Sequence, residues 1–372
     1  MPARIPTSSP ILGDLESRYV LDALAKGEIS GLSGSCVSGF EEAFAGFCGV
    51  PEGVATTSGT SALHLAVRTV GLGYGDEVLV ATLTNMATFF SVIQCGATPI
   101  PVDVEADTGN LDPSLLHEKL TLRTVGVLVV HLFGHPADMH PIQEFCAAHG
   151  LWLIEDAAEA HGATYRGQRV GSFGEAGCFS FYANKIITTG EGGMITFKDA
   201  ALAADARNKR NLAFGEDRRF MHTGVGYNYR MTNLQGALGL AQMSRIEDNI
   251  AGKQDIAAKY DVGLADLPNV GLPPQRKDCE SVYWMYHVVL TGEWENRRDE
   301  CRDLLSAQGI DTRESFVPFD QQEFFIDRGA VKANQCPVAA RIGANGFYLP
   351  SGPHLPGQDQ ERVIAALRMI LE

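Results

Sequence analysis

Between residues 50 and 200, short and almost entirely apolar runs alternate with segments of helical periodicity. A strand that is apolar along its whole length must be covered on both faces, so this alternation predicts a mainly parallel sheet flanked by helices, in an α/β fold. The expected strands are Val78–Ala81, Thr98–Val102, Val125–Leu132 and Leu151–Ile154, and the clearest expected helices are Ser61–Val70 and Ile142–His149.

The pattern changes in the last third of the chain. One long helical stretch runs from Met231 to about Leu264, and glycine and proline turns follow Pro268. Because 372 residues exceed the size at which one hydrophobic core stops growing, we expect a large domain over residues 1–245 and a smaller α+β domain over residues 246–372. The elements expected in the second domain are strands at Tyr286–Leu290 and around Phe316–Phe319 and a helix at Asp359–Leu371.

Charge and cysteine usage narrow the class of protein. The formal net charge of −15 argues against nucleic acid or an anionic membrane surface as a partner, because both require a basic face. The eight cysteines form no C-x-x-C pair, which favours free thiols over a zinc site or a disulfide framework. The first residues lack the apolar core of a signal peptide, and no apolar run is long enough to span a bilayer. We therefore expect a cytoplasmic protein without a metal site.

Small and hydroxyl residues precede the first expected helix, in the order Ser58, Gly59, Thr60 and Ser61. A helix N-terminus offers free backbone N–H groups and the positive end of the helix dipole, and hydroxyls add further donors. The segment is therefore a candidate phosphate site. The alternative is a plain N-cap, because serine and threonine cap many helices that bind no ligand.

Two ionisable residues follow expected strands. Asp156 comes just after Leu151–Ile154, where ligands of parallel sheets gather, and a carboxylate there can keep a pyridine nitrogen protonated. An N-cap or a metal ligand is the alternative for Asp156. Lys185 lies 29 positions later, between an aromatic segment and a glycine-rich turn. Lysine amines form Schiff bases with carbonyl cofactors. Most lysines are solvated surface charges, but the apolar neighbours of Lys185 predict partial burial.

A fourth polar segment, Tyr227–Asn233, opens another expected helix. It contains Asn228 and Arg230, whose side chains suit the recognition of phosphate or carboxylate. The alternative is a polar loop that ends in an N-cap.

Taken together, the order and spacing of these segments resemble fold-type I enzymes that use pyridoxal 5′-phosphate (PLP). The chain is similar to the DegT/DnrJ/StrS family of sugar aminotransferases from about Phe40 to Ser351, and most similar to its members that make GDP-perosamine. The resemblance implies a large domain with a mainly parallel sheet, a smaller α+β domain and PLP as the cofactor. The segments that carry it are His131–Met139, Glu155–Gly162, Ser180–Met194 and Tyr227–Gln242.

The resemblance also implies roles for individual residues. Lys185 would be the Schiff-base lysine and proton shuttle, Asp156 the partner of the pyridine nitrogen, and Glu159 a neighbour of the ring. Asn228 would reach the cofactor phosphate of a neighbouring subunit, which implies a homodimer with shared active sites. The remaining residues implied near the cofactor phosphate are Gly59, Thr60, Ser61 and Ser180.

The chain departs from the family pattern at positions where substrate contacts are expected. Asn85 replaces an aromatic residue that usually stacks on the cofactor ring, and an amide stacks more weakly. Glu314 and Asp320 stand where the perosamine-type enzymes tend to have proline and histidine. Together with Arg230, we treat Glu314 and Asp320 as candidates for binding the substrate or the amino donor.

The resemblance implies transfer of an amino group from glutamate to a nucleotide-linked 4-keto-6-deoxy sugar, within O-antigen biosynthesis. The partners would then be a nucleotide sugar and an amino-acid donor. One alternative is a different nucleotide-linked keto-sugar, or a keto-cyclitol with glutamine as donor. Others are a PLP-dependent sugar dehydratase, whose members resembling this chain carry histidine in place of Lys185, and a non-catalytic PLP-binding regulator. The sequence leaves the nucleotide, the keto carbon and the product stereochemistry open.

Overall fold

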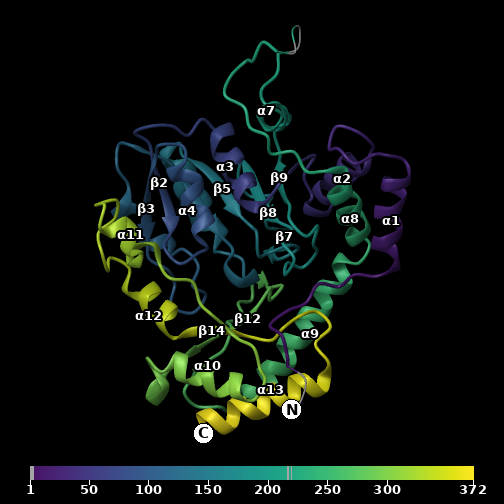
Figure 1. Ribbon diagram of the computed structural model, residues 1–372. Helices are drawn as coiled ribbons and strands as arrows, with labels where there is room; N and C mark the ends of the chain where they lie inside the picture. Colours follow the sequence, from purple (N-terminus) through teal and green to yellow (C-terminus); the bar gives the residue numbers. More distant parts are fainter. Residues whose placement is uncertain (1–3, 216–217, 219) are drawn as a thin grey trace.

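A computed structural model describes residues 4–215, 218 and 220–372, and a seven-stranded sheet forms the centre of its larger part (Figure 1). Strand β9 pairs antiparallel with both neighbours, and every other pairing in this sheet is parallel. The expectation of a mainly parallel sheet is therefore confirmed. From edge to edge the strands are β1 (Glu52–Thr56), β9 (Gly193–Phe197), β8 (Ala176–Ser180), β5 (Trp152–Asp156), β4 (Thr124–Val130), β2 (Glu77–Ala81) and β3 (Thr98–Val102).

Both faces of this sheet are buried, which explains the continuous apolar runs. Along β2, Val78 and Val80 pack into one apolar cluster while Leu79 and Ala81 pack into another, because successive strand residues point to opposite faces. The first cluster includes residues of α3 (Gly59–Thr69), α4 (Met86–Ile93) and α7 (Ala200–Arg210), and the second includes residues of α2 (Cys36–Cys48) and α6 (Met139–His149).

Two further helices pack outside the second face. Helix α8 (Asn233–Met243) contacts both α2 and α1 (Asp14–Ala25), and the three lie together on one side of Figure 1. Three short helical segments complete this part of the chain, namely η1 (Pro113–Leu115), α5 (Leu116–Lys119) and η2 (Leu132–Gly134).

A smaller antiparallel sheet lies below the large one, at the end of the molecule that holds both termini (Figure 1). Its strand order is β10 (Val270–Gly271), β12 (Tyr286–Leu290), β14 (Gly346–Leu349) and β13 (Arg313–Glu314). Its apolar core includes residues of α9 (Ile246–Leu264), α10 (Arg298–Ala307) and α13 (Gly357–Leu371). The other elements here are η3 (Gly292–Trp294), η4 (Phe319–Gln321), α11 (Glu323–Ile326) and α12 (Pro337–Asn345).

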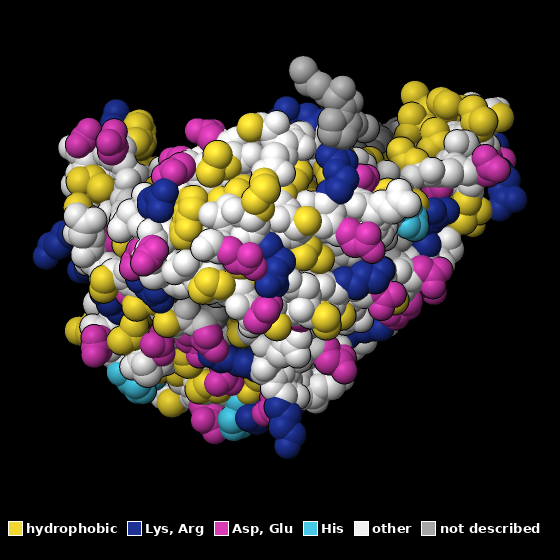
Figure 2. All heavy atoms as spheres, turned by 90° about the horizontal axis from the view of Figure 1, so that it is seen from below, with side chains coloured by type: hydrophobic (Ala, Val, Ile, Leu, Met, Phe, Trp, Pro, Cys, Tyr) yellow, Lys and Arg dark blue, Asp and Glu magenta, His cyan; other side chains and the backbone are white. Residues whose placement is uncertain are grey.

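The face at this end carries charges of both signs. Figure 2 views it from below and shows acidic and basic side chains interspersed over it. Opposite charges on α10, on α13 and beside them form surface ion pairs, such as Arg298 with Glu314 and Arg368 with Asp266. Such exposed pairs contribute little to stability, typically about 0–1 kcal/mol each.

Helix α9 joins the two parts of the molecule. Its first turns place Ile246 and Ile250 in a core of the large sheet, whereas Ile256 and the residues after it pack in the core of the small sheet. A three-stranded sheet also crosses the junction, with β11 (Cys279–Glu280) pairing with β6 (Thr164–Tyr165), which pairs with β7 (Gln168–Arg169). Because the two ends of α9 pack in different cores, we propose that the boundary between the two domains lies near residue 246.

The helical pattern expected from residue 231 to about 264 is confirmed and forms two helices, α8 and α9. The structure corrects the expected organisation in two other places. Ile5, expected in the large domain, is buried in the core of the small sheet and pairs with Ile310. No strand forms at Phe316–Phe319, because Pro318 has no N–H for a sheet and Phe319 stacks on Phe89 with a 4.1 Å centroid separation. Among the described residues, no helix combines the length and apolarity needed to cross a bilayer.

Candidate active site

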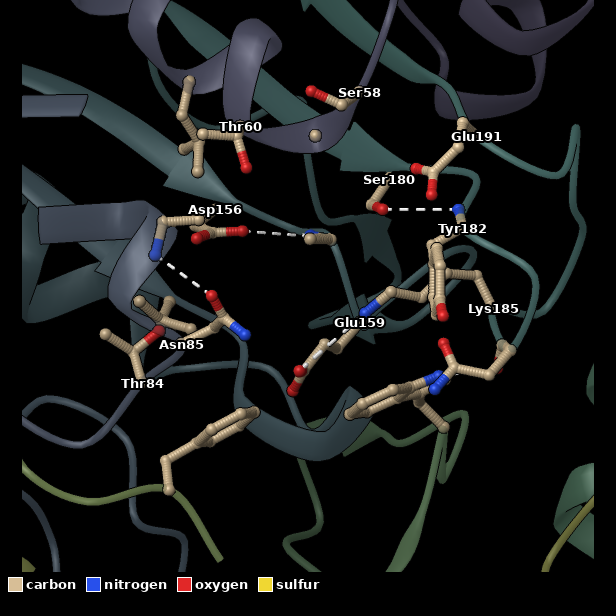
Figure 3. A pocket seen from close by; sticks show the side chains of 18 of the residues that line it. Ser58, Thr60, Thr84, Asn85, Asp156, Glu159, Ser180, Tyr182, Lys185 and Glu191 are labelled. Carbon is tan, nitrogen blue, oxygen red and sulfur yellow. Dashed lines mark hydrogen bonds and ion pairs between the residues drawn. The ribbon is translucent and has the colours of Figure 1, made fainter. Parts of the chain in front are cut away.

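The main pocket lies at the carboxyl edge of the large sheet. Strands β1, β2, β4, β5 and β8 run in the same direction, so the residues that follow them meet at one edge. A pocket of about 360 Å³ opens there, a volume suited to a small ligand (Figure 3). It brings together most of the expected cofactor residues, namely Gly59, Thr60, Asn85, Asp156, Glu159, Ser180 and Lys185.

One end of the pocket is the N-terminus of α3. Ser58 caps the helix, with its Oγ accepting from the Ser61 N–H at 3.1 Å, and the Ser61 Oγ accepts in return from the Ser58 N–H at 2.9 Å. This capping box leaves the N–H groups of Gly59 and Thr60 without a partner in the helix. Figure 3 shows the Thr60 and Ser180 hydroxyls at this end of the pocket, which could therefore hold an anionic group.

Gly59 permits this arrangement because it lies directly against Ser180. A Cβ atom on Gly59 would lie 2.8 Å from the Ser180 Cβ, closer than real side chains pack. Any other residue would push the helix start away from β8 and separate the two sets of donors.

The Asp156 carboxylate is buried and held in place from two sides. Its Oδ2 accepts from the Thr88 hydroxyl at 2.7 Å, and its Oδ1 accepts from the Ala158 N–H at 3.2 Å. Burial raises the pKa of Asp156, which these hydrogen bonds and Lys185 partly offset. Among the described residues no cation lies within ion-pair distance of this carboxylate, so it is available to a positively charged ligand atom.

Lys185 points toward Glu159 across the pocket (Figure 3), and the two charged groups lie 3.8 Å apart. The Lys185 side chain is only 10% exposed, which agrees with the expected burial. Burial lowers the pKa of Lys185, although Glu159 and Asp156 act in the opposite direction. Burial likewise raises the pKa of Glu159 to about 7, although Lys185 and the Phe133 N–H, 2.9 Å from Oε2, both favour its charged form. Burial thus disfavours the charged form of both groups, while their mutual attraction favours it.

Two expected substrate residues lie outside the pocket. Asp320 is fully buried, with its carboxylate accepting from the Thr82 hydroxyl at 3.0 Å and from the Cys336 N–H at 2.9 Å. Glu314 is exposed and pairs with Arg298 at 3.1 Å. Asp320 thus ties a loop to the large sheet, and Glu314 belongs to the surface.

Three other expected residues also do not line the pocket of their own chain. The Ser61 hydroxyl is used within the capping box. Asn228 is exposed, and the Arg230 guanidinium donates to the Asn211 side chain at 2.8 Å. The capping box accounts for the position of the Ser61 hydroxyl. Contacts within this chain give Asn228 and Arg230 no role in the pocket of their own chain.

The sequence profile of the DegT/DnrJ/EryC1/StrS aminotransferase family matches residues 10–368. The chain belongs to this family. It is 42% identical over 369 residues to GDP-perosamine synthase of Caulobacter vibrioides, covering 99% of this chain and 98% of the relative. It is also 39% identical over 339 residues to dTDP-3-amino-3,4,6-trideoxy-alpha-D-glucose transaminase of Streptomyces venezuelae, covering 91% and 87%.

A solved structure gives the same result for the fold. The crystal structure of S. venezuelae DesV in complex with a ketimine intermediate matches with a TM-score of 0.91 and 35% identity, over 100% of this chain and 99% of that one. This DegT-family aminotransferase therefore has the fold of PLP-dependent aminotransferases, as the sequence resemblance implied.

The pocket of this family member fits PLP on two observations. The close approach of Gly59 to Ser180 builds a cradle for the phosphate, and the buried Asp156 carboxylate is free to face a protonated ring nitrogen. Lys185 lines the same pocket, where it could reach the cofactor aldehyde.

Sequence reasoning missed several residues of the site, four of which stand out by their contacts or chemistry. Thr88 orients Asp156, and the ring of Trp284 lies with its centroid 3.8 Å from the Lys185 Nζ. Tyr348 and Arg313 line the pocket from the small sheet, and Arg313 is the sole arginine among the described lining residues. Trp284, Arg313 and Tyr348 lie far along the chain from Lys185, so no local pattern connects them with it.

Proposed function

We propose that this aminotransferase moves an amino group from glutamate to a nucleotide-linked 4-keto-6-deoxy sugar, in the manner of a GDP-perosamine synthase. The observation that carries the proposal is the buried Lys185 amine in one pocket with the hydroxyls at the start of α3 and the Asp156 carboxylate. The 42% identity to the Caulobacter vibrioides GDP-perosamine synthase supports the choice of substrate class.

Lys185 supplies both the amine that holds the cofactor and the base that moves the proton. Its lowered pKa keeps a larger fraction of the amine neutral near pH 7, as a nucleophile and a base require. When bound, PLP withdraws electrons from the carbon that loses its proton. Asp156 would keep the ring nitrogen protonated, and Glu159, held by the Phe133 N–H, would lie beside the ring, where it could accept a proton near neutral pH.

The remaining pocket residues divide between cofactor and substrate. Gly59, Thr60 and Ser180 bind the phosphate. Asn85 caps α4 by accepting from the Ala87 N–H at 3.0 Å, which leaves its NH₂ group for the ligand. Arg313 lies at the small-sheet wall and suits a carboxylate of the donor or a phosphate of the nucleotide.

The reaction partners can be tested directly. Purified protein is incubated with GDP-, UDP- and dTDP-linked 4-keto-6-deoxy sugars and with glutamate or glutamine, and products are identified by mass spectrometry and NMR. We expect the highest kcat/KM with the GDP-linked sugar and glutamate. Higher kcat/KM with a dTDP-linked sugar, or with a keto-cyclitol and glutamine, would instead favour the alternatives within the family. Elimination of water without amine transfer would indicate a dehydratase.

We also propose that the active enzyme is a cytoplasmic homodimer whose sites are shared, and that its product enters O-antigen biosynthesis. The support for sharing is the position of Asn228, which is exposed and outside the pocket of its own chain. Its neighbour Tyr229 fixes this segment, because its hydroxyl lies 3.0 Å from the His64 Nδ1 on α3.

Mixing two inactive variants tests the shared site. Lys185→Ala and Asn228→Ala chains are each expected to be weakly active, and their mixture under subunit exchange should recover about a quarter of wild-type activity. This value follows because half of the random dimers are mixed and each mixed dimer holds one intact site. Exchange is verified independently by mass spectrometry of differently tagged chains. No recovery despite complete exchange would place both residues in the same subunit's site.

A further inference from the structure

Lys253 on α9 is a buried lysine outside the pocket. It is 1% exposed, and among the described residues no carboxylate lies within ion-pair distance of its Nζ. The amine donates instead to two backbone carbonyls, that of Trp284 at 2.7 Å and that of Ser351 at 2.5 Å. A buried charge without a counterion is unfavourable, and burial alone lowers the pKa of Lys253 to about 7. A neutral amine still has two N–H donors, so both contacts survive the loss of a proton.

The first of these contacts leads directly to the catalytic amine. The Trp284 ring lies with its centroid 3.8 Å from the Lys185 Nζ, and its Nε1–H donates to the Asn184 carbonyl at 2.9 Å. The face of an indole ring attracts an ammonium group and covers it from water. The position of this ring therefore affects the balance between the charged and neutral forms of Lys185.

The second contact fixes the neighbouring strand. Ser351 follows β14, and its Oγ accepts from the Tyr286 N–H at the start of β12 at 3.2 Å. Tyr348 on β14 lines the pocket. The Lys253 amine thus ties two strand ends to α9, namely the segment before β12 and the segment after β14. Trp284 and Tyr348, which lie in or beside these segments, line the pocket on its small-sheet side.

Helix α9 also holds the segment that contains Lys185. Asn249 lies one turn before Lys253 and is 4% exposed, and its side chain donates to the Ile186 carbonyl at 2.8 Å. Residues four apart lie on one face of a helix. The same face of α9 therefore holds the backbone beside Lys185 and the backbone of the tryptophan that covers it.

We propose that Lys253 is a positioning residue of the aminotransfer reaction, which holds the Trp284 ring on the Lys185 amine and so sets how readily that amine exchanges a proton. This inference rests on the proposed role of Lys185. A methionine at position 253 has a similar length but donates no hydrogen bond, so the Trp284 and Ser351 carbonyls would lose their partner. The ring would then be released from the amine.

The test measures the Lys185 amine in the protein without cofactor. Trace acetylation with acetic anhydride over a pH range, quantified on the peptide that contains Lys185, gives the apparent pKa of that amine. We expect Lys253→Met to shift it by about 0.5 unit or more, because the amine loses both its contact with the indole and the cover that keeps water from it. Trp284→Leu should give the same shift alone, and Lys253→Met should add nothing in that background.

Gln360→Met is the matched control. Gln360 is also buried and donates to a backbone carbonyl, that of Ile256 at 2.7 Å, but it does not contact Trp284. Both methionine variants should lower Tm, and only Lys253→Met should shift the pKa of Lys185. If Lys253→Met does not fold, Lys253→Gln, which retains one donor, should give a smaller shift in the same direction.

Two results would overturn the inference. An unchanged pKa of Lys185 in a destabilised Lys253 variant would make the residue merely structural. Additive shifts in the double variant would show that Lys253 acts by a route other than Trp284. The labelling needs no cofactor, so it tests the role of Lys253 independently of the proposed function. The proposed function is tested separately by borohydride reduction of the wild-type protein, and a cofactor found on another lysine would contradict it.

Discussion

The Lys185→Ala variant is expected to lose turnover by more than about 1,000-fold, because one amine serves both the covalent attachment of the cofactor and the proton transfer. The wild-type protein should be yellow as purified, and borohydride should bleach the colour and fix the cofactor on the peptide that contains Lys185. The variant should still bind pyridoxamine phosphate, since Gly59, Ser180 and Asp156 remain. Its fold should be retained, as thermal unfolding will show.

Removal of the amine also changes Glu159. Lys185 lies 3.8 Å from the Glu159 carboxylate and favours its charged form, so the pKa of Glu159, already about 7, should rise further in the variant. Lys198→Ala is the control, because Lys198 is the next lysine along the chain and donates to the Phe173 carbonyl at 2.9 Å, outside the pocket. Wild-type turnover in Lys185→Ala, or the reduced cofactor on another lysine, would refute the central assignment.

Asp156→Asn is expected to reduce turnover by on the order of 100-fold or more, because a neutral amide cannot keep the ring nitrogen protonated. An asparagine oxygen can still accept from the Thr88 hydroxyl, so the fold should change little. Turnover with glutamate and the nucleotide sugar is compared with Tm and with cofactor affinity. Near-normal turnover in this variant would remove Asp156 from the mechanism.

A second buried carboxylate provides the control for this change. Asp320 is fully buried and accepts two hydrogen bonds, as Asp156 does, but it lies outside the pocket. Asp320→Asn should therefore lower Tm and leave kcat close to that of the wild type. A similar loss of kcat in both variants would show that removing a buried charge, and not losing a ring partner, causes the effect.

The large sheet could be predicted from the sequence because its information is local. Strand β3 and the small-domain strand β12 begin and end where the apolar runs do, and β2 is longer than predicted by one residue. Parallel strands bring their carboxyl ends to one edge, so Asp156, at the end of β5, and Lys185, after β8, could be placed in one site before any contact was known. The family pattern adds Gly59, Glu159 and Ser180, which the structure brings to the same pocket.

Local patterns failed where packing between distant segments decides the outcome. Asp320 is a charged residue followed by two glutamines, yet it lies in the interior, where the preceding Phe319 stacks on Phe89. Ile5 reads as part of the first domain but pairs with Ile310, because the start of the chain crosses to the small sheet. In both cases the burial of apolar surface by a neighbour overrides the polarity of the surrounding sequence.

The sequence by itself predicted the sheet through its periodicity, and its resemblance to a known family implied the cofactor class and the roles of Asp156 and Lys185. Only the tertiary structure decided what surrounds the Lys185 amine. Trp284 contacts that amine because α9 docks the small sheet against the large one and Lys253 holds the Trp284 backbone. The position of one side chain over another depends on how two cores pack together, and no spacing along the chain encodes that geometry.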